Sequence, residues 1–307
     1  MIRRSLLALA RSHRVKAWAM ALPATRNVVA RFVPGETIEE CLNAVRTLAE
    51  DGLLASIDHL GEDTTSPAQA QSARDAYVDL LRRLGEQGLV GQAEVSVKLT
   101  ALGLGLPDGV AVALRHARDI CATAAHVGTT VTVDMEDRTR TEATLGILEA
   151  LRADHPGTGG VLQAYLLRTP EDCRRFRLPG ARIRLCKGAY AEPAEVAHQT
   201  PAAVAAAYRS CLGILMSGPG YPMVATHDPA MIAAALELIG EHGRDPGSYE
   251  FQMLYGIRAD EQRRLAAAGH RVRVYVPYGT DWWGYFLRRL AERPANLAFF
   301  LRALIGA

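Results

Sequence analysis

The sequence lacks the short motifs that mark common metal and disulfide sites. Its five cysteines are far apart and include no C-x-x-C pair, and none of its nine histidines belongs to an H-E-x-x-H motif. An odd number of scattered cysteines fits free thiols in a reducing compartment and argues against a disulfide framework or a zinc site. We therefore expect neither disulfide bonds nor a metal centre.

Long hydrophobic runs and a strong excess of either charge are also missing. No apolar run approaches the roughly 18 residues that span a bilayer, and 49% hydrophobic with 22% charged residues is a globular composition. The 35 basic and 33 acidic residues leave a net charge of +2, which argues against a protein held on nucleic acid by phosphate contacts. We expect a cytoplasmic protein that binds no nucleic acid.

Acidic residues are absent from the first 35 positions, which hold seven basic residues. The other 272 residues carry 28 basic and 33 acidic residues, a net charge of −5. We predict a basic helical arm over residues 1–50 and a barrel over residues 51–307. Each Lys or Arg near anionic lipid contributes about 1 kcal/mol of attraction, so the arm offers a route to the inner face of the cytoplasmic membrane. An arm packed on the barrel is the alternative.

Short apolar or β-branched runs alternate with Ala-, Leu- and Arg-rich stretches of helical spacing from about residue 54 onward. Strands that alternate with helices indicate βαβ units and a parallel sheet, whose strands read as near-continuous apolar runs because both faces are buried. The eight predicted strands are Leu54–Leu60, Ala93–Leu99, Thr129–Met135, Gly160–Leu166, Arg182–Lys187, Pro222–His227, Tyr249–Leu254 and Arg271–Pro277.

The number of predicted strands fits a closed barrel. Eight strands, each followed by a helix, close a (βα)₈ barrel of about 250 residues, and the stretch from residue 54 to residue 307 has 254. We predict an α/β fold of the TIM-barrel type. An open doubly wound sheet is the structural alternative.

A polar or charged residue lies near the carboxyl end of every predicted strand. The carboxyl ends of barrel strands carry the chemistry of such folds, and buried polar groups are costly unless they are paired or used. One such residue can equally face solvent, but eight that converge on one rim predict a site there. They are Asp58 with Glu62, Lys98, Asp134, Gln163, Arg184 with Lys187, Thr226 with His227 and Asp228, Gln252, and Tyr275.

The last predicted helix adds a pair of arginines. Tyr285 and Arg288 are three residues apart, as are Arg289 and Glu292, so each pair shares a helix face. An arginine pair can grip a carboxylate bidentately. A solvated basic helix end is the alternative.

Several of these segments, in this order along the chain, resemble the FAD-dependent proline dehydrogenase family, whose members oxidise L-proline to Δ1-pyrroline-5-carboxylate. The resemblance runs from about Leu53 to the C-terminus. Each segment alone is a weak signal, but all of them together in this order are specific for the family. The set comprises Asp58–Glu62, Val97–Thr100, Asp134–Asp137, Arg184–Tyr190, Thr226–His227, Gln252–Leu254, and Tyr275 with the Tyr285–Glu292 helix.

The resemblance implies a distorted (βα)₈ barrel with FAD at the carboxyl ends of the strands. It implies that Lys98, Arg288 and Arg289 clamp the proline carboxylate, which fixes the orientation that presents a ring C–H to the flavin. The other residues implied for the substrate site are Leu254, Tyr275 and Tyr285 against the pyrrolidine ring, Asp134 as an orienting group, and Glu62 as a gate that pairs with Arg288.

The implied flavin contacts lie mainly on the later strands. A cation beside the flavin ring stabilises its reduced, anionic form and favours hydride acceptance, and Arg184 with Gln163 is expected there. Gly188 would allow close approach of the backbone. The remaining expected FAD-binding positions are Lys187, Ala189, Tyr190, Thr226, His227, Gln252 and Glu292.

The implied reaction is hydride transfer from the proline ring carbon beside nitrogen to flavin N5, with the electrons then passed to a quinone. No base for the ammonium proton is evident in the sequence, and solvent can serve. The chain has no room for the aldehyde dehydrogenase module of bifunctional relatives, so we expect a separate pyrroline-5-carboxylate dehydrogenase to take the product.

Two other functions fit the same residues. Lys98 at a strand end can be the Schiff-base nucleophile of a barrel lyase, or it can pair with a carboxylate. A non-catalytic barrel that only binds its ligand would need the same Lys98, Arg288 and Arg289.

Overall fold

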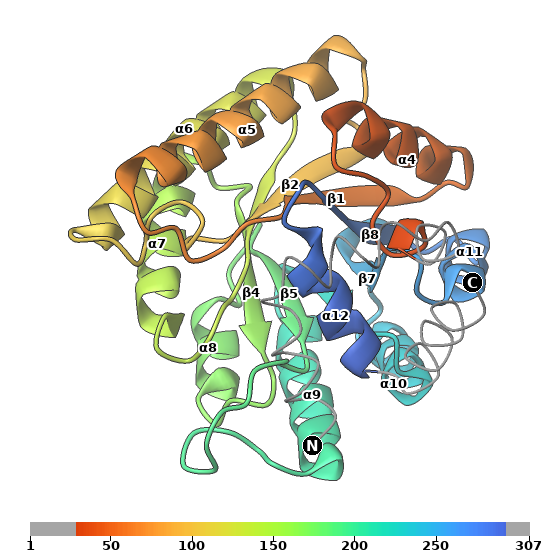
Figure 1. The fold of residues 1–307 in the computed structure, drawn as a ribbon. Coiled ribbons are helices and arrows are strands. Elements are labelled where there is room, and N and C mark those ends of the chain that lie inside the picture. The colour runs from red at the N-terminus through yellow and green to blue at the C-terminus, as the bar shows by residue number, and fades with distance from the viewer. Residues whose placement is uncertain (1–28, 293–307) are drawn as a thin grey trace, which may run out of the picture.

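The structure is a computed structural model that describes residues 29–292, with the backbone alone described for residues 288–292. Eight strands close into a barrel in sequence order, and each neighbouring pair is parallel (Figure 1). The predicted barrel is confirmed, and the open doubly wound sheet is wrong. The strands are β1 (Leu54–His59), β2 (Ala93–Val97), β3 (Val131–Val133), β4 (Gly159–Gln163), β5 (Arg182–Cys186), β6 (Tyr221–Ala225), β7 (Glu250–Leu254) and β8 (Val272–Tyr278).

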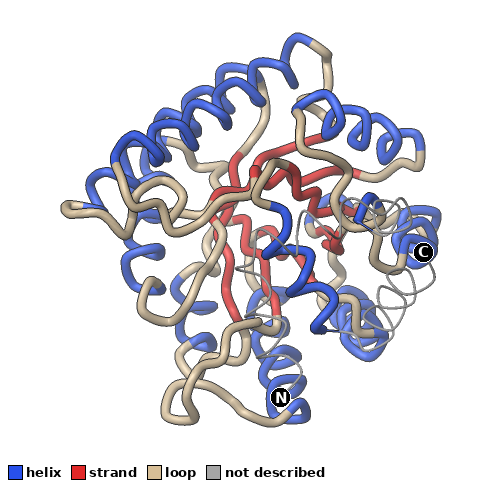
Figure 2. Tube along the Cα trace, viewed as in Figure 1, coloured by secondary structure: helices blue, strands red, loops and turns tan. Residues whose placement is uncertain are grey.

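Helices surround the ring of strands, as Figure 2 shows in blue around red. No helix within residues 29–292 combines the length and hydrophobicity of a membrane span. The helices are α4 (Ile38–Glu50), α5 (Pro67–Glu86), α6 (Gly109–Val127), α7 (Thr141–Asp154), α8 (Thr169–Arg175), α9 (Pro201–Met216), α10 (Pro229–Glu241), α11 (Ala259–Ala267) and α12 (Trp282–Glu292), with a 3₁₀ turn at Pro246–Ser248.

Of the helices described, α4 comes before the alternation of strand and helix begins, and α12 completes that alternation after β8. α4 precedes β1 and begins with a capping box in which the Thr37 and Glu40 side chains each bond the other's backbone N–H. Residues 1–28 of the predicted basic arm lie outside the described residues. α12 crosses in front of the ring of strands (Figure 1), and its first residue is anchored by the hydrogen bond that Trp282 Nε1 donates to Glu36 Oε1 at 2.6 Å.

The first six strands end one to three residues earlier than the sequence predicts. At β4, for example, the Leu166 N–H and the Thr169 hydroxyl both donate to the Gln163 carbonyl, at 3.1 and 2.6 Å. These turn bonds satisfy the backbone, so the chain leaves the sheet. Lys98 and Asp134 consequently lie just past their strands, at the mouth of the barrel.

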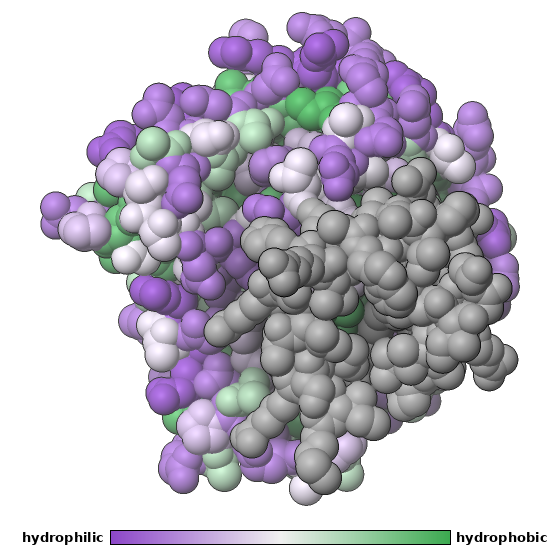
Figure 3. All heavy atoms as spheres, viewed as in Figure 1, coloured by the Kyte–Doolittle hydropathy of each residue, from purple (hydrophilic) through white to green (hydrophobic). Residues whose placement is uncertain are grey.

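The apolar core lies between the barrel and its helices. Successive side chains of a strand point to opposite faces, so Ile57, Val95 and Val274 face the helices, and each is fully buried. Burying a side chain of this size contributes about 1.5–3 kcal/mol. The outer faces of the helices in view are largely hydrophilic (Figure 3).

The interior of the barrel is charged, whereas branched apolar side chains dominate the interior of most such barrels. Near the amino ends of the strands, Arg182 Nη2 lies 2.5 Å from Glu94 Oε2, and Arg273 Nε lies 2.8 Å from Glu250 Oε1. Both carboxylates are buried. Burial alone would raise the pKa of Glu94, but the guanidiniums of Arg182, Arg273 and Arg184 hold it below the ordinary value. We call these four residues (Glu94, Arg182, Glu250, Arg273) the lower ion cluster.

Removing the Glu94 charge should destabilise the fold at neutral pH. A carboxyl with a lowered folded pKa contributes stability that is complete above its unfolded pKa, here about 4.5, and that is lost as pH falls through the folded pKa. Glu94→Gln should lower the free energy of unfolding at pH 7 by about 3–5 kcal/mol, because it leaves the partly buried Arg182 and Arg273 without this carboxylate inside the barrel. It should also flatten the loss of stability below about pH 4.5, measured by urea unfolding between pH 3.5 and 7.

Glu149→Gln is the matched control, because Glu149 pairs with Arg175 on the surface at 2.7 Å. An exposed pair contributes about 0–1 kcal/mol. Equal losses of stability in the two variants at pH 7 would contradict the assignment of Glu94.

Candidate active site

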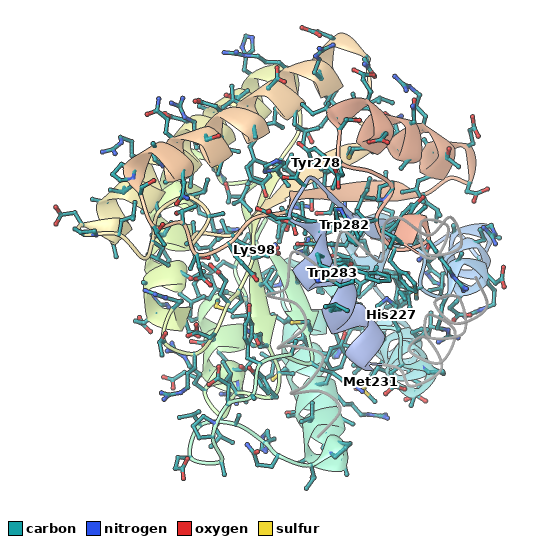
Figure 4. The ribbon with its side chains drawn as sticks, in the orientation of Figure 1. Lys98, His227, Met231, Tyr278, Trp282 and Trp283 are labelled. Atoms are coloured by element: carbon teal, nitrogen blue, oxygen red, sulfur yellow. The ribbon has the colours of Figure 1, made fainter. Side chains whose placement is uncertain are left out.

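A cavity of about 190 Å³ opens at the carboxyl end of the barrel. It lies between the start of α12 and the ends of β1 and β2, and Figure 4 shows Lys98 beside that helix. A larger surface groove of about 570 Å³ lies outside the barrel between α8, α9 and the end of α10 and shares no residue with it. The cavity is lined by Leu60, Gly61, Glu62, Lys98, Asp281, Gly284 and Tyr285.

Lys98 is held between two carboxylates. Its Nζ lies 2.5 Å from Asp58 Oδ2 and 3.9 Å from Asp134 Oδ2, and it donates to Tyr275 OH at 3.4 Å. Burial by itself would lower the lysine pKa, but Asp58 and Asp134 raise it above its ordinary value. Lys98 is therefore a permanent cation at the cavity wall. Its pairing with a carboxylate, one of the two alternatives from the sequence, is confirmed.

Asp134 connects Lys98 to the barrel interior. Its Oδ2 accepts a hydrogen bond from Tyr275 OH at 2.7 Å, and its Oδ1 accepts from Arg184 Nη1 at 2.6 Å and Ser96 Oγ at 2.8 Å. Burial and the carboxylates of Asp134 and Asp58 raise the pKa of Tyr275 well above its ordinary value, so this phenol stays protonated. The geometry fits the orienting role expected for Asp134.

Arg184 and Gln252 are directed into the interior of the barrel. Each lies two residues before the end of its strand, β5 and β7, near the carboxyl end as the sequence predicts. The Arg184 guanidinium donates to Ser56 Oγ, Ser96 Oγ, Asp134 and Gln252 Oε1. The sequence did not predict these partners, because an apolar run reveals which residues alternate but not which layer of a closed barrel each one reaches.

Gln163 carries a buried acceptor that could meet a ligand. It ends β4 and is 3% exposed. Its Nε2 donates to the Glu136 carbonyl at 2.6 Å, while its Oε1 has no hydrogen-bond partner among the described residues. Leaving a buried acceptor unpaired costs about 1–3 kcal/mol. A ring N–H such as that of a flavin would satisfy it.

The loop after β5 packs its glycine tightly against a neighbouring aromatic ring. Gly188 has φ +108°, and a Cβ there would lie 2.1 Å from the Tyr165 ring. Lys187 Nζ lies 2.6 Å from Asp228 Oδ2, which joins this loop to the start of α10. Ala189 and Tyr190 follow on the same loop, exposed to solvent.

The loop after β6 is fixed by His227. The Leu254 N–H donates to His227 Nε2 at 2.8 Å, so the imidazole proton lies on Nδ1. Arg258 donates to the His227 carbonyl at 2.7 Å, and the Asp228 N–H donates to Thr226 Oγ1 at 3.1 Å. The ends of β6 and β7, which carry three of the expected site residues, are thereby held together.

The remaining expected residues lie on α12. The predicted helix is present, and Tyr285 is buried against the cavity. The side chains of Arg288, Arg289 and Glu292 lie outside the described residues, and so does the expected pairing of Glu62 with Arg288. Glu62 itself lines the cavity.

Sequence reasoning gave no role to several residues that build the site. Asp58 binds Lys98 directly, and Tyr77 on α5 donates to the Ser96 carbonyl at 2.8 Å beneath it. Polar residues at every second position of otherwise apolar runs were the available signal. The pattern occurs as Ser56-x-Asp58, Glu94-x-Ser96-x-Lys98, Arg182-x-Arg184, Glu250-x-Gln252 and Arg273-x-Tyr275.

These features define an α/β-barrel protein with a partly buried cation and a cavity at the mouth of the barrel. A family model described as proline dehydrogenase matches residues 41–302. The chain is 40% identical over 305 residues to proline dehydrogenase 1 of Bacillus subtilis (strain 168), covering 99% of both proteins. It is 41% identical to the proline dehydrogenase of Deinococcus radiodurans, covering 91% of this chain and 90% of that protein. The chain belongs to the proline dehydrogenase family and is an oxidoreductase.

A solved structure has the same fold. The crystal structure of proline utilization A from Bdellovibrio bacteriovorus, inactivated by N-propargylglycine, superposes with a TM-score of 0.82 at 24% sequence identity. The match covers 87% of this chain and spans about a third of that one. It supports the barrel topology.

Gly188→Ala should disrupt the loop after β5. The added Cβ would overlap the Tyr165 ring, and a positive φ costs an L-residue about 1–3 kcal/mol. We expect a lower free energy of unfolding, measured by urea denaturation. Gly180→Ala is the control, because Gly180 has φ +68° with nothing within 4 Å of a Cβ. If the two variants behave alike, close packing at Gly188 is not what the site requires.

Proposed function

We propose that the chain oxidises L-proline to Δ1-pyrroline-5-carboxylate with FAD as its bound cofactor. The observation that carries the proposal is 40% identity over 99% of a Bacillus subtilis proline dehydrogenase. The cavity beside Lys98 supports it, because a partly buried ammonium beside Tyr275 and Tyr285 suits a small amino acid with a carboxylate and an apolar ring.

The substrate carboxylate binds Lys98, together with Arg288 and Arg289 of α12. Lys98 is 14% exposed and held as a cation, so its charge is in place before the substrate arrives. Tyr275 and Tyr285, with Leu254 at the end of β7, pack against the pyrrolidine ring. Binding the carboxylate and the ring at two places fixes which C–H faces the cofactor.

The residues of β4, β5 and the loops after β5 and β6 fit FAD. The unpaired Gln163 Oε1 would accept a ring N–H, and Arg184 would supply positive charge that favours a reduced, anionic ring. When bound, FAD supplies the acceptor for the hydride, at N5, from the ring carbon beside nitrogen. The residues that would hold it are Gln163, Arg184, Lys187, Gly188, Ala189, Tyr190, Thr226, His227, Gln252 and Glu292.

The ammonium proton of proline leaves to solvent. Lys98 does not accept it, because its raised pKa keeps it protonated. The raised pKa of Lys98 also counts against a Schiff-base lyase, which needs a neutral amine at this position.

After the oxidation, a quinone takes the electrons and a separate pyrroline-5-carboxylate dehydrogenase takes the product. The basic arm brings the enzyme to an anionic membrane surface.

The proposal is tested by an anaerobic spectrum. The purified chain reconstituted with FAD should be yellow and should bleach on addition of L-proline, with one pyrroline-5-carboxylate formed per flavin reduced. A colourless protein that FAD cannot reconstitute would refute the proposal. Proline binding without bleaching would instead identify a non-catalytic barrel.

Variants of the two site lysines should distinguish a role in substrate binding from a role in cofactor binding. Lys98→Met removes a charge-assisted hydrogen bond worth about 1.5–3 kcal/mol and should raise the Michaelis constant for proline by about 10–100-fold, with FAD still bound. Lys187→Met should weaken FAD binding and leave the Michaelis constant unchanged at saturating FAD. Steady-state kinetics with a dye acceptor and FAD titration measure both.

Lys98→Arg is the conservative control, since it keeps the charge and should lose less affinity than Lys98→Met. Loss of FAD from Lys98→Met with an unchanged Michaelis constant would show that Lys98 serves the cofactor instead.

A further inference from the structure

The side-chain amide of Gln252 lies between a carboxylate and a guanidinium inside the barrel. Its Nε2 donates to Glu250 Oε1 at 2.5 Å, and its Oε1 accepts from Arg184 Nε. An amide offers donors on one side and an acceptor on the other. If this amide were rotated by 180°, its oxygen would face the Glu250 carboxylate and its N–H groups would face the Arg184 N–H. Both contacts are unfavourable, so the two neighbours fix the orientation of the amide.

Glu250 is itself firmly held. It is fully buried, and Arg273 binds it through Nε at 2.8 Å and Nη2 at 3.1 Å. The Tyr221 hydroxyl donates to its Oε2 at 3.1 Å. Burial alone would raise the pKa of Glu250, but Arg273 lowers it below the ordinary value. The side that faces Gln252 is therefore a fixed negative charge.

Gln252 in turn sets the plane of Arg184. The guanidinium is planar, so a bond at Nε fixes the directions of Nη1 and Nη2. Nη1 reaches Asp134 and Nη2 reaches Ser56. Asp134 Oδ2 also accepts a hydrogen bond from the Tyr275 hydroxyl and lies 3.9 Å from Lys98 Nζ. Three hydrogen bonds thus connect Glu250, at the amino end of β7, to the carboxylate beside the cavity.

We propose that Glu250 is a positioning residue that acts through Gln252 on Arg184 and so sets the positive charge that the reduced cofactor meets. This inference rests on the proposed function. It differs from a purely structural role in the lower ion cluster, because its effect passes through the orientation of one amide and is blocked when that amide is removed.

The test compares the FAD-loaded wild type with Glu250→Gln, Gln252→Leu and the double variant. The readouts are the flavin midpoint potential and visible spectrum, with kcat and the Michaelis constant for proline measured alongside. Glu250→Gln should make flavin reduction about tenfold less favourable, a negative shift of about 30 mV for two electrons. We expect kcat to fall while the Michaelis constant stays near that of the wild type, because Lys98 is untouched.

The double variant distinguishes the relay from two independent effects. If Glu250 acts through Gln252, Glu250→Gln should add no further shift of potential to Gln252→Leu. Additive shifts would overturn the inference. Tyr221→Phe is the matched control, since it removes a hydrogen bond from the same carboxylate on the side away from Gln252, and it should leave the potential unchanged. An equal shift in Tyr221→Phe and Glu250→Gln would also overturn it.

A charge-balanced variant keeps the inference testable if Glu250→Gln alone fails to fold. Glu250→Gln/Arg273→Gln removes both partners and leaves no unpaired guanidinium from this pair, and it should show the same negative shift. A wild type that binds no flavin would overturn the proposed function and this inference together. A wild-type flavoprotein whose potential does not respond to either Glu250 variant overturns this inference alone.

Discussion

The charged interior of the barrel is the constraint on which the rest of this structure depends. Three guanidiniums and three carboxylates, together neutral, fill the space between strands that are apolar on their outer faces. The three carboxylates and Arg184 are buried and the other two guanidiniums are partly buried, so these charges would be unfavourable without one another. The same closure of the barrel that brings these charges together therefore also sets the charge of the site. The six residues are Glu94, Asp134, Arg182, Arg184, Glu250 and Arg273.

The charges are arranged in layers that follow the pleat of the strands. The lower ion cluster lies nearest the amino ends, Arg184 and Gln252 lie above it, and Lys98 with Asp58 and Asp134 faces the cavity. Because these groups stand on strands or directly at their ends, their positions are fixed by the sheet and not by mobile loops. A site built in this way is organised before its ligands bind, which is what electrostatic stabilisation of a reaction requires.

The sequence predicted the barrel because eight apolar runs alternate with helical stretches, and it predicted that Lys98 and Tyr285 share a site. It did not predict the partner of Lys98 or the depth of Arg184. Strand register and barrel closure decide which residues meet across the interior. Neither can be predicted from the sequence of one strand, such as Arg182–Lys187. Asp58 was visible as a strand-end residue, but only the pairing of β1 with β2 brings it to Lys98.

The surroundings of Lys98 also explain how one cation can serve both the fold and a ligand. An ammonium has three N–H groups. Among the described residues, Asp58 and the Tyr275 hydroxyl account for two of them, which leaves one for a carboxylate in the cavity. Under the proposed function, a substrate need not displace Asp58 in order to bind. Asp58 keeps Lys98 charged, and Tyr275 is fixed by Asp134. The carboxylate binding that we propose would therefore depend on contacts that also stabilise the barrel.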